Sequence, residues 1–292
     1  MKLIQSFWTK PYVKTGSLSG GWMEAKYHLF SWALSTNLLN EIYNEVYLYT
    51  DSLGKIILCD LLELPFSKVY TSLDDLHKYN SNLWTFGKVH TYGLQNEPFL
   101  HVDSDVFIAQ KFPQPLMDGE IIFQNYDLNL NIYKVAYNQL KNMNCSLPKF
   151  ITCELSESYC GLNAGIFGGN SVSRIKEYVA EVKLFHDQNK EIIDSMDVTN
   201  INIFLEQLFM YYYFTNKECR LNPLFPELDT GFQNYTHFWK IAREKNYIHL
   251  ISFYKKKRQL LEQMEAFLRF KYPNSYYKSL DLINRYSFDE IN

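Results

Sequence analysis

The sequence lacks any long hydrophobic run. No stretch approaches the roughly 18 to 20 consecutive apolar residues that a membrane-spanning helix needs, so no such helix is expected. The first residues, MKLIQSFWTKPYVK, contain only a two-residue apolar run before Gln5. Because a secretory signal needs an apolar core of about 7 to 15 residues, we expect the protein to remain in the cytoplasm.

The sequence also lacks an excess of charge of one sign, because its 29 Lys and Arg nearly balance its 32 Asp and Glu. The resulting net charge of −3 provides no field that attracts a polyanion, which argues against nucleic acid as a partner. The five cysteines are odd in number and form no CxxC pair, which argues against a zinc knuckle or a disulfide framework. No repeat and no linker rich in Pro, Gly or Ser divides the chain.

What the sequence does contain is an apolar fraction of 47% over 292 residues, enough for a sizeable core. Apolar runs predict strands over residues 2–8, 44–51, 98–108, 120–125, 160–170 and 246–252. Apolar periodicity predicts helices over residues 22–40, 82–95, 171–189, 202–214 and 255–272, the third beginning at a serine cap, with a turn-rich loop over 10–21. This alternation predicts an α/β fold with a mixed, mostly parallel sheet flanked by helices.

Two aspartates, Asp103 and Asp105, interrupt the apolar run FLHVDSDVFI. Burying an unpaired carboxylate costs several kcal/mol, so a pair at this position calls for a compensating cation. Carboxylate oxygens suit Mn²⁺ or Mg²⁺, and such ions are commonly shared with substrate phosphates. On a strand, residues i and i+2 share a face, so both side chains can meet one ion. A polar turn that closes the strand is the alternative.

An apolar strand ending in Asp-x-Asp, in an α/β chain of this length, resembles the GT-A glycosyltransferases. The resemblance implies that the aspartates hold Mn²⁺ against the diphosphate of a nucleotide sugar. NAGIFGGN (163–170) is similar to a strand of the glycogenin-like and lipopolysaccharide galactosyltransferase-like branch. It implies that Asn163 binds sugar hydroxyls, and that Ala164 and Gly165 let the backbone approach the donor. A tightly packed strand with a glycine turn is the alternative.

The His-x-x-Gly-x-x-Lys pattern of the same branch resembles His249 to Lys255. The resemblance implies that His249 completes the metal shell and that Lys255 meets the diphosphate. The sequence departs from the pattern because Ser252 stands in the place of the glycine and no Pro-Trp follows the lysine. A packing histidine and a solvated basic face, the run KKKR, are the alternatives.

Glu206 and Gln207 stand where the branch carries an Asp-Gln pair near the reacting sugar. This position implies that they stabilise the reacting centre or orient the acceptor. The alternative is the polar stripe of an amphipathic helix. Asp127 and Asp229 are further candidate carboxylates.

Nucleotide contacts are expected where the first two strands end, because ligands of open α/β sheets gather outside the carboxyl ends of strands. The candidates are Phe7, Trp8, Tyr49 and Asp51, where an aromatic ring could stack on a base and the carboxylate could accept from an imide or a ribose hydroxyl. Lys88 could neutralise phosphate, although a surface lysine is the simpler interpretation.

These expectations combine into one GT-A domain over residues 1–256 and a basic helical extension over 257–292 packed on it. The extension could contact an anionic membrane or an acceptor, or it could simply dock as a terminal helix. The predicted protein is a metal-dependent, hexosyltransferase-like enzyme. It would move sugar with retention from a nucleotide sugar, a UDP-sugar being favoured, to a glycan, lipid, peptide or small-molecule hydroxyl.

Two other functions remain open from the sequence. A haloacid-dehalogenase-type phosphohydrolase also carries two aspartates at a strand end, the first acting as nucleophile. Phe107 stands where that family has Thr or Val, and the motif lies far from the N-terminus, which disfavours it. The other function is a non-catalytic protein that binds carbohydrate or nucleotide.

Overall fold

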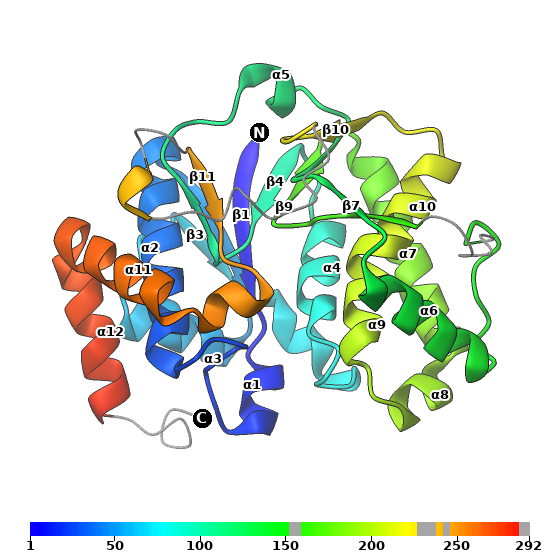
Figure 1. Ribbon diagram of the computed structural model, residues 1–292, viewed down its shortest axis with the longest axis horizontal. Helices are drawn as coiled ribbons and strands as arrows, with labels where there is room; N and C mark the ends of the chain where they lie inside the picture. The colour runs from blue at the N-terminus through cyan, green and yellow to red at the C-terminus, as the bar shows by residue number, and fades with distance from the viewer. Residues whose placement is uncertain (152–158, 227–237, 242–245, 286–292) are drawn as a thin grey trace. The chain divides into compact units, whose positions relative to one another are not determined.

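The computed structural model describes residues 1–151, 159–226, 238–241 and 246–285. The chain forms two compact units, each assembled from separate stretches of sequence (Figure 1). The first unit comprises Met1, Leu76–His101 and Pro113–Gly231, and the second comprises Lys2–Asp75, Val102–Phe112 and Phe232–Asn292.

Three parallel strands form the sheet of the second unit in the order β1-β2-β3, with β1 at Lys2–Phe7, β2 at Val46–Thr50 and β3 at Lys68–Tyr70. Leu3 to Gln5 are all buried, as expected of a parallel strand that is covered on both faces. A separate antiparallel pair joins β5 (Val106–Ile108) to β11 (Tyr247–His249). This pair places His249 opposite Val106, which directly follows the Asp-x-Asp motif.

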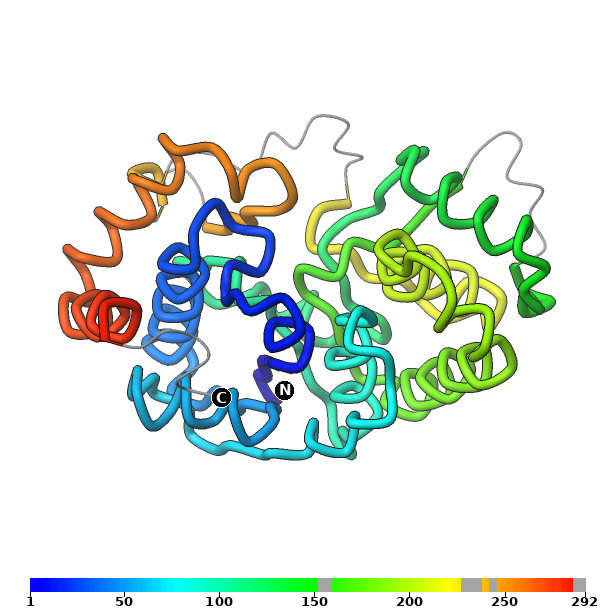
Figure 2. Tube along the Cα trace, turned by 90° about the horizontal axis from the view of Figure 1, so that it is seen from below, coloured from blue at the N-terminus to red at the C-terminus, as the bar shows by residue number. Residues whose placement is uncertain are grey.

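The helical segments of the second unit are α1 (Lys10–Thr15), α2 (Ala25–Tyr43), α3 (Ser52–Lys55), η1 (Ile56–Leu61), η4 (Phe238–Lys240), η5 (Ser252–Lys256), α11 (Arg258–Lys271) and α12 (Pro273–Arg285). In Figure 1 and Figure 2, α11 and α12 (orange to red) lie beside α2 (blue). Leu261 and Leu268 of α11 and Leu282 of α12 are buried in one core with Phe30 of α2. The apolar face of α11 is therefore packed against protein, as for a docked terminal helix.

The sheet of the first unit has the strand order β10-β6-β9-β4. Strand β10 pairs with β6 in parallel, whereas β6 pairs with β9 in antiparallel fashion. A two-stranded antiparallel sheet joins β7 to β8. The bounds are β4 (Phe99–Val102, its last residue in the second unit), β6 (Ile121–Phe123), β7 (Tyr126–Leu128), β8 (Cys160–Leu162), β9 (Ile166–Gly169) and β10 (Leu221–Pro223).

Aromatic rings pack two helices of the first unit, α7 (Val172–Gln188) and α10 (Phe209–Asn216), against each other. The other helical segments of this unit are α4 (Thr85–Gly93), α5 (Gln114–Met117), α6 (Asn131–Asn142), α8 (Lys190–Ser195), α9 (Thr199–Ile203) and η3 (Phe204–Leu208), while η2 (Ser72–Lys78) spans the sequence boundary between the units. Tyr178 of α7 packs against Phe209, Tyr213 and Phe214 of α10 at ring separations of 5.5 to 6.1 Å. Buried rings, whose area makes them strong contributors to a core, thus hold these helices together.

The predicted α/β class with a mixed, mostly parallel arrangement of strands is confirmed by these pairings. Three details of the prediction were wrong. Residues 10–21 contain helix α1, residues 98–108 form two strands separated by the aspartates, and residues 160–170 also form two strands. Helix α7 begins after Ser171 as predicted, but the serine side chain makes no capping hydrogen bond.

Among the described residues, no helix has both the length and the apolar character needed to cross a membrane. The proposed division of the sequence at residue 256 stays a prediction.

Candidate functional site

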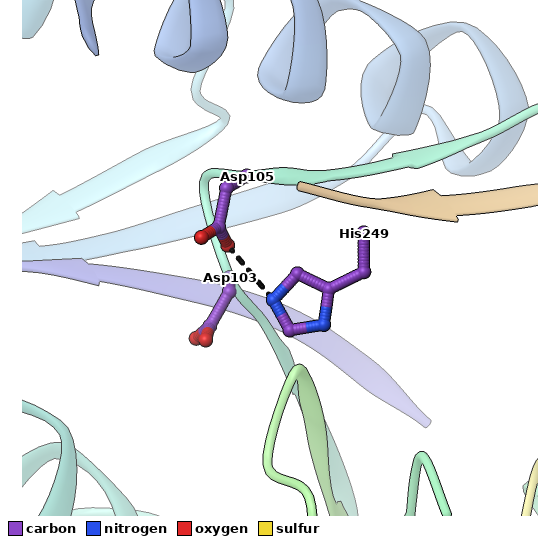
Figure 3. A group of neighbouring side chains, drawn as sticks. All are labelled: Asp103, Asp105 and His249. Carbon is purple, nitrogen blue, oxygen red and sulfur yellow. Dashed lines mark ion pairs between the residues drawn. The ribbon is translucent and has the colours of Figure 1, made fainter. Parts of the chain in front are cut away.

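The Asp-x-Asp motif lies on the turn that connects β4 to β5 (Figure 3). The backbone N–H of Val106 donates to the carbonyl of Asp103 at 3.1 Å, which closes the turn. The N–H of Leu250 donates to the carbonyl of Asp105 at 3.0 Å, which ties the turn to the residue after β11. The pairing of β5 with β11 therefore places His249 next to the two aspartates.

Three side chains converge at this turn. Ligand atoms of Asp103, Asp105 and His249 all lie within 4.8 Å of one another. The imidazole Nε2 of His249 lies 3.3 Å from Oδ1 of Asp105, and Figure 3 shows the ring pointing toward that carboxylate. Asp105 and His249 are buried and Asp103 is half-buried. Two carboxylates and one imidazole suit a divalent cation such as Mn²⁺, so the donor set fits a metal.

Lys255 brings a cation to the same group. Its Nζ lies 2.7 Å from Oδ2 of Asp105. Burial alone would raise the pKa of the Asp105 carboxyl, but Lys255 and His249 outweigh it and hold that pKa well below its usual range. The ammonium of Lys255 also lies over the ring of Trp22, 5.3 Å from its centre, and the Lys255 carbonyl accepts from the N–H of Met23 at 3.1 Å. The loop before α2 thus holds this lysine in place.

One residue between His249 and Lys255 has a left-handed backbone conformation. Ser252 has a φ of +48°, in the left-handed region that glycine enters most easily. The departure from the family pattern at this position therefore leaves the backbone conformation glycine-like. His249 and Lys255, on either side of this residue, both contact Asp105.

Tyr12 was not singled out by its sequence context. Its ring stacks on His28 at 5.1 Å, and the two rings pack against Phe7. Burial, with the charges of Asp105 and Asp103, raises the pKa of the Tyr12 hydroxyl, which stays neutral in the physiological range. A tyrosine in a turn-rich stretch gives no periodic signal, so its place beside the acidic pair could not be inferred.

The predicted nucleotide-contact residues are largely covered by protein. Phe7, Trp8 and Tyr49 are 3%, 6% and 5% exposed. The ring of Tyr49 stacks on Tyr70 at 4.8 Å. Little of these three rings is open to a base, and their contact with a nucleotide stays a prediction.

Asp51 has partners within the fold. Its Oδ2 accepts from the N–H and the hydroxyl of Thr9 at 2.7 and 2.8 Å, and its Oδ1 accepts from the N–H of Gly54 at 2.9 Å. Asp51 thereby caps α3 and ties it to the end of β1. Burial raises the pKa of this carboxyl, although the three hydrogen bonds oppose the rise.

The first unit carries a separate polar cluster around Asn163. Its Nδ2 donates to Oδ2 of Asp127 at 3.1 Å, and its Oδ1 accepts from the N–H of Gly165 at 3.1 Å. Asn125 donates to Oδ1 of Asp127 at 3.0 Å. Asn163, Asp127 and Asn125 are all buried. The carboxylate of Asp127 thus accepts hydrogen bonds from two amide side chains. Asp127 is one of the two further candidate carboxylates named from the sequence. The other, Asp229, lies outside the described residues.

Gln207 joins this cluster through Tyr133, whose hydroxyl donates to Oε1 of Gln207 at 2.7 Å. Burial, followed by the charge of Asp127, raises the pKa of the Tyr133 hydroxyl well above its usual value. A Cβ on Gly161 would lie 2.3 Å from that hydroxyl oxygen, so the glycine makes room for the tyrosine. The sequence signalled Gln207 and Asn163 but not the tyrosine between them.

Glu206 and Lys88 form an ion pair within the first unit. The side chain of Glu206 is 3% exposed and that of Lys88 is 14% exposed, so the pair is largely buried. Glu206 and Gln207 lie on η3, a π-helical turn between α9 and α10. Such turns occur frequently at functional sites. Lys88 therefore has a carboxylate partner rather than standing as a simple surface lysine.

The glycine-rich run has two different roles along its length. Ala164 and Gly165 lie between β8 and β9 and are buried. A Cβ on Gly168 would lie 2.0 Å from the carbonyl oxygen of Phe99, and one on Gly169 would lie 2.1 Å from that of Glu120. These last two glycines serve close backbone packing, as the alternative interpretation proposed.

The structure thus brings the predicted site residues together in two groups. Asp103, Asp105, His249 and Lys255 meet in the second unit. Asn163 and Gln207 share one cluster in the first unit, which also holds the pair of Glu206 with Lys88.

By sequence, residues 1–282 match the model of a family described as a family of unknown function, DUF6734. No curated protein matches the chain.

Several solved structures resemble the chain at low identity. A galactosyltransferase, LgtC, with donor and acceptor sugar analogues is 10% identical over 69% of each chain, with a TM-score of 0.36. Mouse xyloside xylosyltransferase 1 is 11% identical over 85% of this chain and 96% of its own, with a TM-score of 0.42. The bifunctional glycosyltransferase WbbM is 12% identical over 96% of this chain and 51% of its own, with a TM-score of 0.46.

Proposed function

The chain belongs to the DUF6734 family, and we propose that it is a metal-dependent glycosyltransferase of GT-A architecture that uses a nucleotide-diphosphate sugar. The observation that carries this proposal is the convergence of Asp103, Asp105 and His249 on one point, with Lys255 beside them. Together they supply a divalent-metal donor set and a further cation at one turn. A diphosphate needs this combination of charges, because its oxygens carry the negative charge that grows when the sugar leaves.

The three ligands would hold Mn²⁺, or Mg²⁺, through two carboxylates and an imidazole. When bound, such an ion supplies Lewis acidity and a template for the diphosphate. Lys255 would place its ammonium against a diphosphate oxygen, and Trp22 would hold the lysine side chain during this contact. Asp105 orients both His249 and Lys255, since each lies within 3.3 Å of one of its oxygens.

The polar cluster of the first unit has the chemistry to bind sugar hydroxyls. Asn163 and Gln207 supply amides that can donate to and accept from hydroxyl groups. Asp127 and Tyr133 hold these amides in fixed orientations. Ala164 and Gly165 present little side-chain bulk, which suits a backbone close to a sugar.

Retention is the stereochemical course that we propose. Inversion requires a side-chain base for the acceptor hydroxyl, whereas the role predicted for Glu206 is to stabilise the reacting centre or orient the acceptor. Its ion pair with Lys88 supports an electrostatic role instead, because the carboxylate already has a cationic partner within the fold. A UDP-sugar is the favoured donor and a glycan, lipid, peptide or small molecule is the acceptor, as the family resemblance implies.

The test is release of UDP from a panel of UDP-sugars, with Mn²⁺ and with EDTA. The matched variants are Asp103→Asn, at the half-buried ligand, and Asp60→Asn, at an exposed aspartate paired with Lys55. We expect Asp103→Asn to lose the Mn²⁺-dependent release, and Asp60→Asn to retain it.

Metal-independent release, or equal activity of both variants, would contradict the proposal. Turnover of a phosphate monoester through a phosphorylated Asp103 would identify the phosphohydrolase instead. Nucleotide binding without turnover under any condition would identify a non-catalytic binding protein.

A further inference from the structure

Two serines of helix α2 contact the turn that carries the acidic pair. The hydroxyl of Ser31 donates to the carbonyl of Ser104 at 2.6 Å, and the hydroxyl of Ser35 donates to the carbonyl of Asp103 at 3.3 Å. The serines are four residues apart and so lie one above the other on the same face of the helix. Both are fully buried, within a helix whose other buried residues are mostly apolar.

A second layer of hydrogen bonds holds Ser35 itself. The Nε2 of Gln5, on strand β1, donates to the Ser35 hydroxyl at 3.1 Å. The Oε1 of Gln5 accepts from the hydroxyl of Thr36 at 2.9 Å. Gln5 and Thr36 are also fully buried. A continuous chain of polar contacts therefore runs from β1 through α2 to the backbone of Asp103.

Both carbonyls lie on the turn between β4 and β5, outside the regular strand ladder. The Asp103 carbonyl also accepts from the N–H of Val106, so Ser35 adds a second donor there, whereas Ser31 supplies the hydrogen bond to the Ser104 carbonyl. A buried carbonyl without a donor carries the desolvation penalty of that group. The two serine hydroxyls meet these carbonyls in the observed backbone arrangement, in which the carbonyls of Asp103 and Ser104 both face α2. That arrangement also fixes where the side chains of Asp103 and Asp105 begin, on either side of Ser104.

We propose that Ser31 and Ser35 are positioning residues that set the spacing of the two metal-binding carboxylates, a role that rests on the metal site of the proposed function. Ligand placement within about 0.5 Å is what a metal site needs from its supporting residues. Loss of such a support typically weakens metal binding 10- to 100-fold. Because Ser31 makes the shorter hydrogen bond, its loss should weaken metal binding more than the loss of Ser35.

The experiment titrates the purified full chain with Mn²⁺ alone and measures free Mn²⁺ by electron paramagnetic resonance. Ser31→Ala is compared with Ser279→Ala, whose hydroxyl is also fully buried and donates to a helix carbonyl, that of Ser275, at 2.8 Å. Each variant loses one buried hydroxyl-to-carbonyl bond within the second unit, but Ser279 lies on α12 and makes no bond to the turn. Thermal melts of both variants measure the purely structural cost.

We expect both variants to melt at lower temperature, while only Ser31→Ala shows a Kd for Mn²⁺ raised about 10- to 100-fold. Ser31→Thr, which keeps the hydroxyl, should restore most of the affinity. Ser35→Ala should raise the Kd by a smaller factor, and it provides the test if Ser31→Ala does not fold.

The inference fails if the serine-to-alanine variants at 31 and 35 bind Mn²⁺ as the unaltered protein does, or if Ser279→Ala weakens binding equally. In both cases the unaltered protein still binds Mn²⁺ and the proposed function stands. Absence of Mn²⁺ binding by the unaltered protein would instead overturn the metal site on which the inference rests.

Discussion

Replacing Ser252 by glycine should stabilise the protein. The residue lies between His249 and Lys255 with a φ of +48°, and it is exposed, so the change removes little packing. A left-handed conformation costs a residue that has a Cβ about 1–2 kcal/mol. Glycine avoids this cost but loses about 0.4–1 kcal/mol through the greater freedom of the unfolded chain. The difference between the middle values of these two ranges gives an expected net gain for Ser252→Gly of about 0.8 kcal/mol.

The comparison that isolates this effect is Ser252→Ala, which removes the hydroxyl but keeps the Cβ. Urea unfolding of the three proteins should place the midpoint of Ser252→Gly above that of Ser252→Ala, with the slopes unchanged. In a thermal melt, a difference of this size corresponds to roughly 1–4 °C for a chain of this length. If Ser252→Gly unfolds at lower urea than Ser252→Ala, the left-handed backbone at this position is refuted. The same result would refute our explanation of how a chain with Ser252 in place of the glycine of the His-x-x-Gly-x-x-Lys pattern still brings His249 and Lys255 to Asp105.

Three further predictions concern buried groups. Burial lowers the pKa of His28 to about 4, despite its hydrogen bond to the Leu18 carbonyl. The unfolded chain, with a histidine pKa of about 6.5, then binds more protons, so stability should fall by roughly 3 kcal/mol as pH drops from 6.5 to 4. Urea unfolding across this pH range checks the fall, which His28→Gln should flatten. Lys88→Met should lower the free energy of unfolding by about 3–5 kcal/mol, because it leaves the buried carboxylate of Glu206 without its cationic partner. Chemical denaturation should show that adding Glu206→Gln recovers much of this loss, and no recovery would count against the ion pair. Gly161→Ala should cost about 1–3 kcal/mol by overlap with the Tyr133 hydroxyl. In a Tyr133→Ala background, which also removes the ring carbon 2.5 Å from the added Cβ, the same change should cost less, and an equal cost would argue against that contact.

The acidic pair could be predicted because it violates a strong rule. Two carboxylates within an apolar run are costly unless something compensates them, and Asp103 and Asp105 lie beside His249 and Lys255 in the structure. The pairing that brings His249 there, β5 with β11, joins segments far apart in the sequence. In the sequence, only the resemblance to the His-x-x-Gly-x-x-Lys pattern indicated that His249 lies near the aspartates, since no local periodicity encodes a partner strand.

The supporting residues could not be predicted from the sequence. A serine in an amphipathic helix resembles a tolerated polar residue, so Ser31 and Ser35 carry no signal until the facing turn is known. Tyr133 likewise gives no sequence signal until its hydrogen-bond partner, Gln207, is known. Asp51 shows the converse case, because a carboxylate at a strand end suggests a ligand contact, whereas this one caps α3 and binds Thr9.

The fold class followed from the alternation of apolar strands with periodic helices, but the interleaving of two units did not. Each unit takes residues from separate stretches of the sequence, for example Val102–Phe112 in the second unit between two stretches of the first. Helix α1 was missed because Gly16 and the polar residues around it dominate the pattern over residues 10–21. Short helices of this kind depend on tertiary packing rather than on intrinsic propensity.

The most direct measurement is anomalous diffraction at the manganese absorption edge, from crystals of the protein grown with Mn²⁺ and UDP. We expect an anomalous peak within coordinating distance of Asp103, Asp105 and His249, with the Lys255 ammonium against the diphosphate. Crystals that hold UDP but show no peak there, or a peak bound to other side chains, would contradict it.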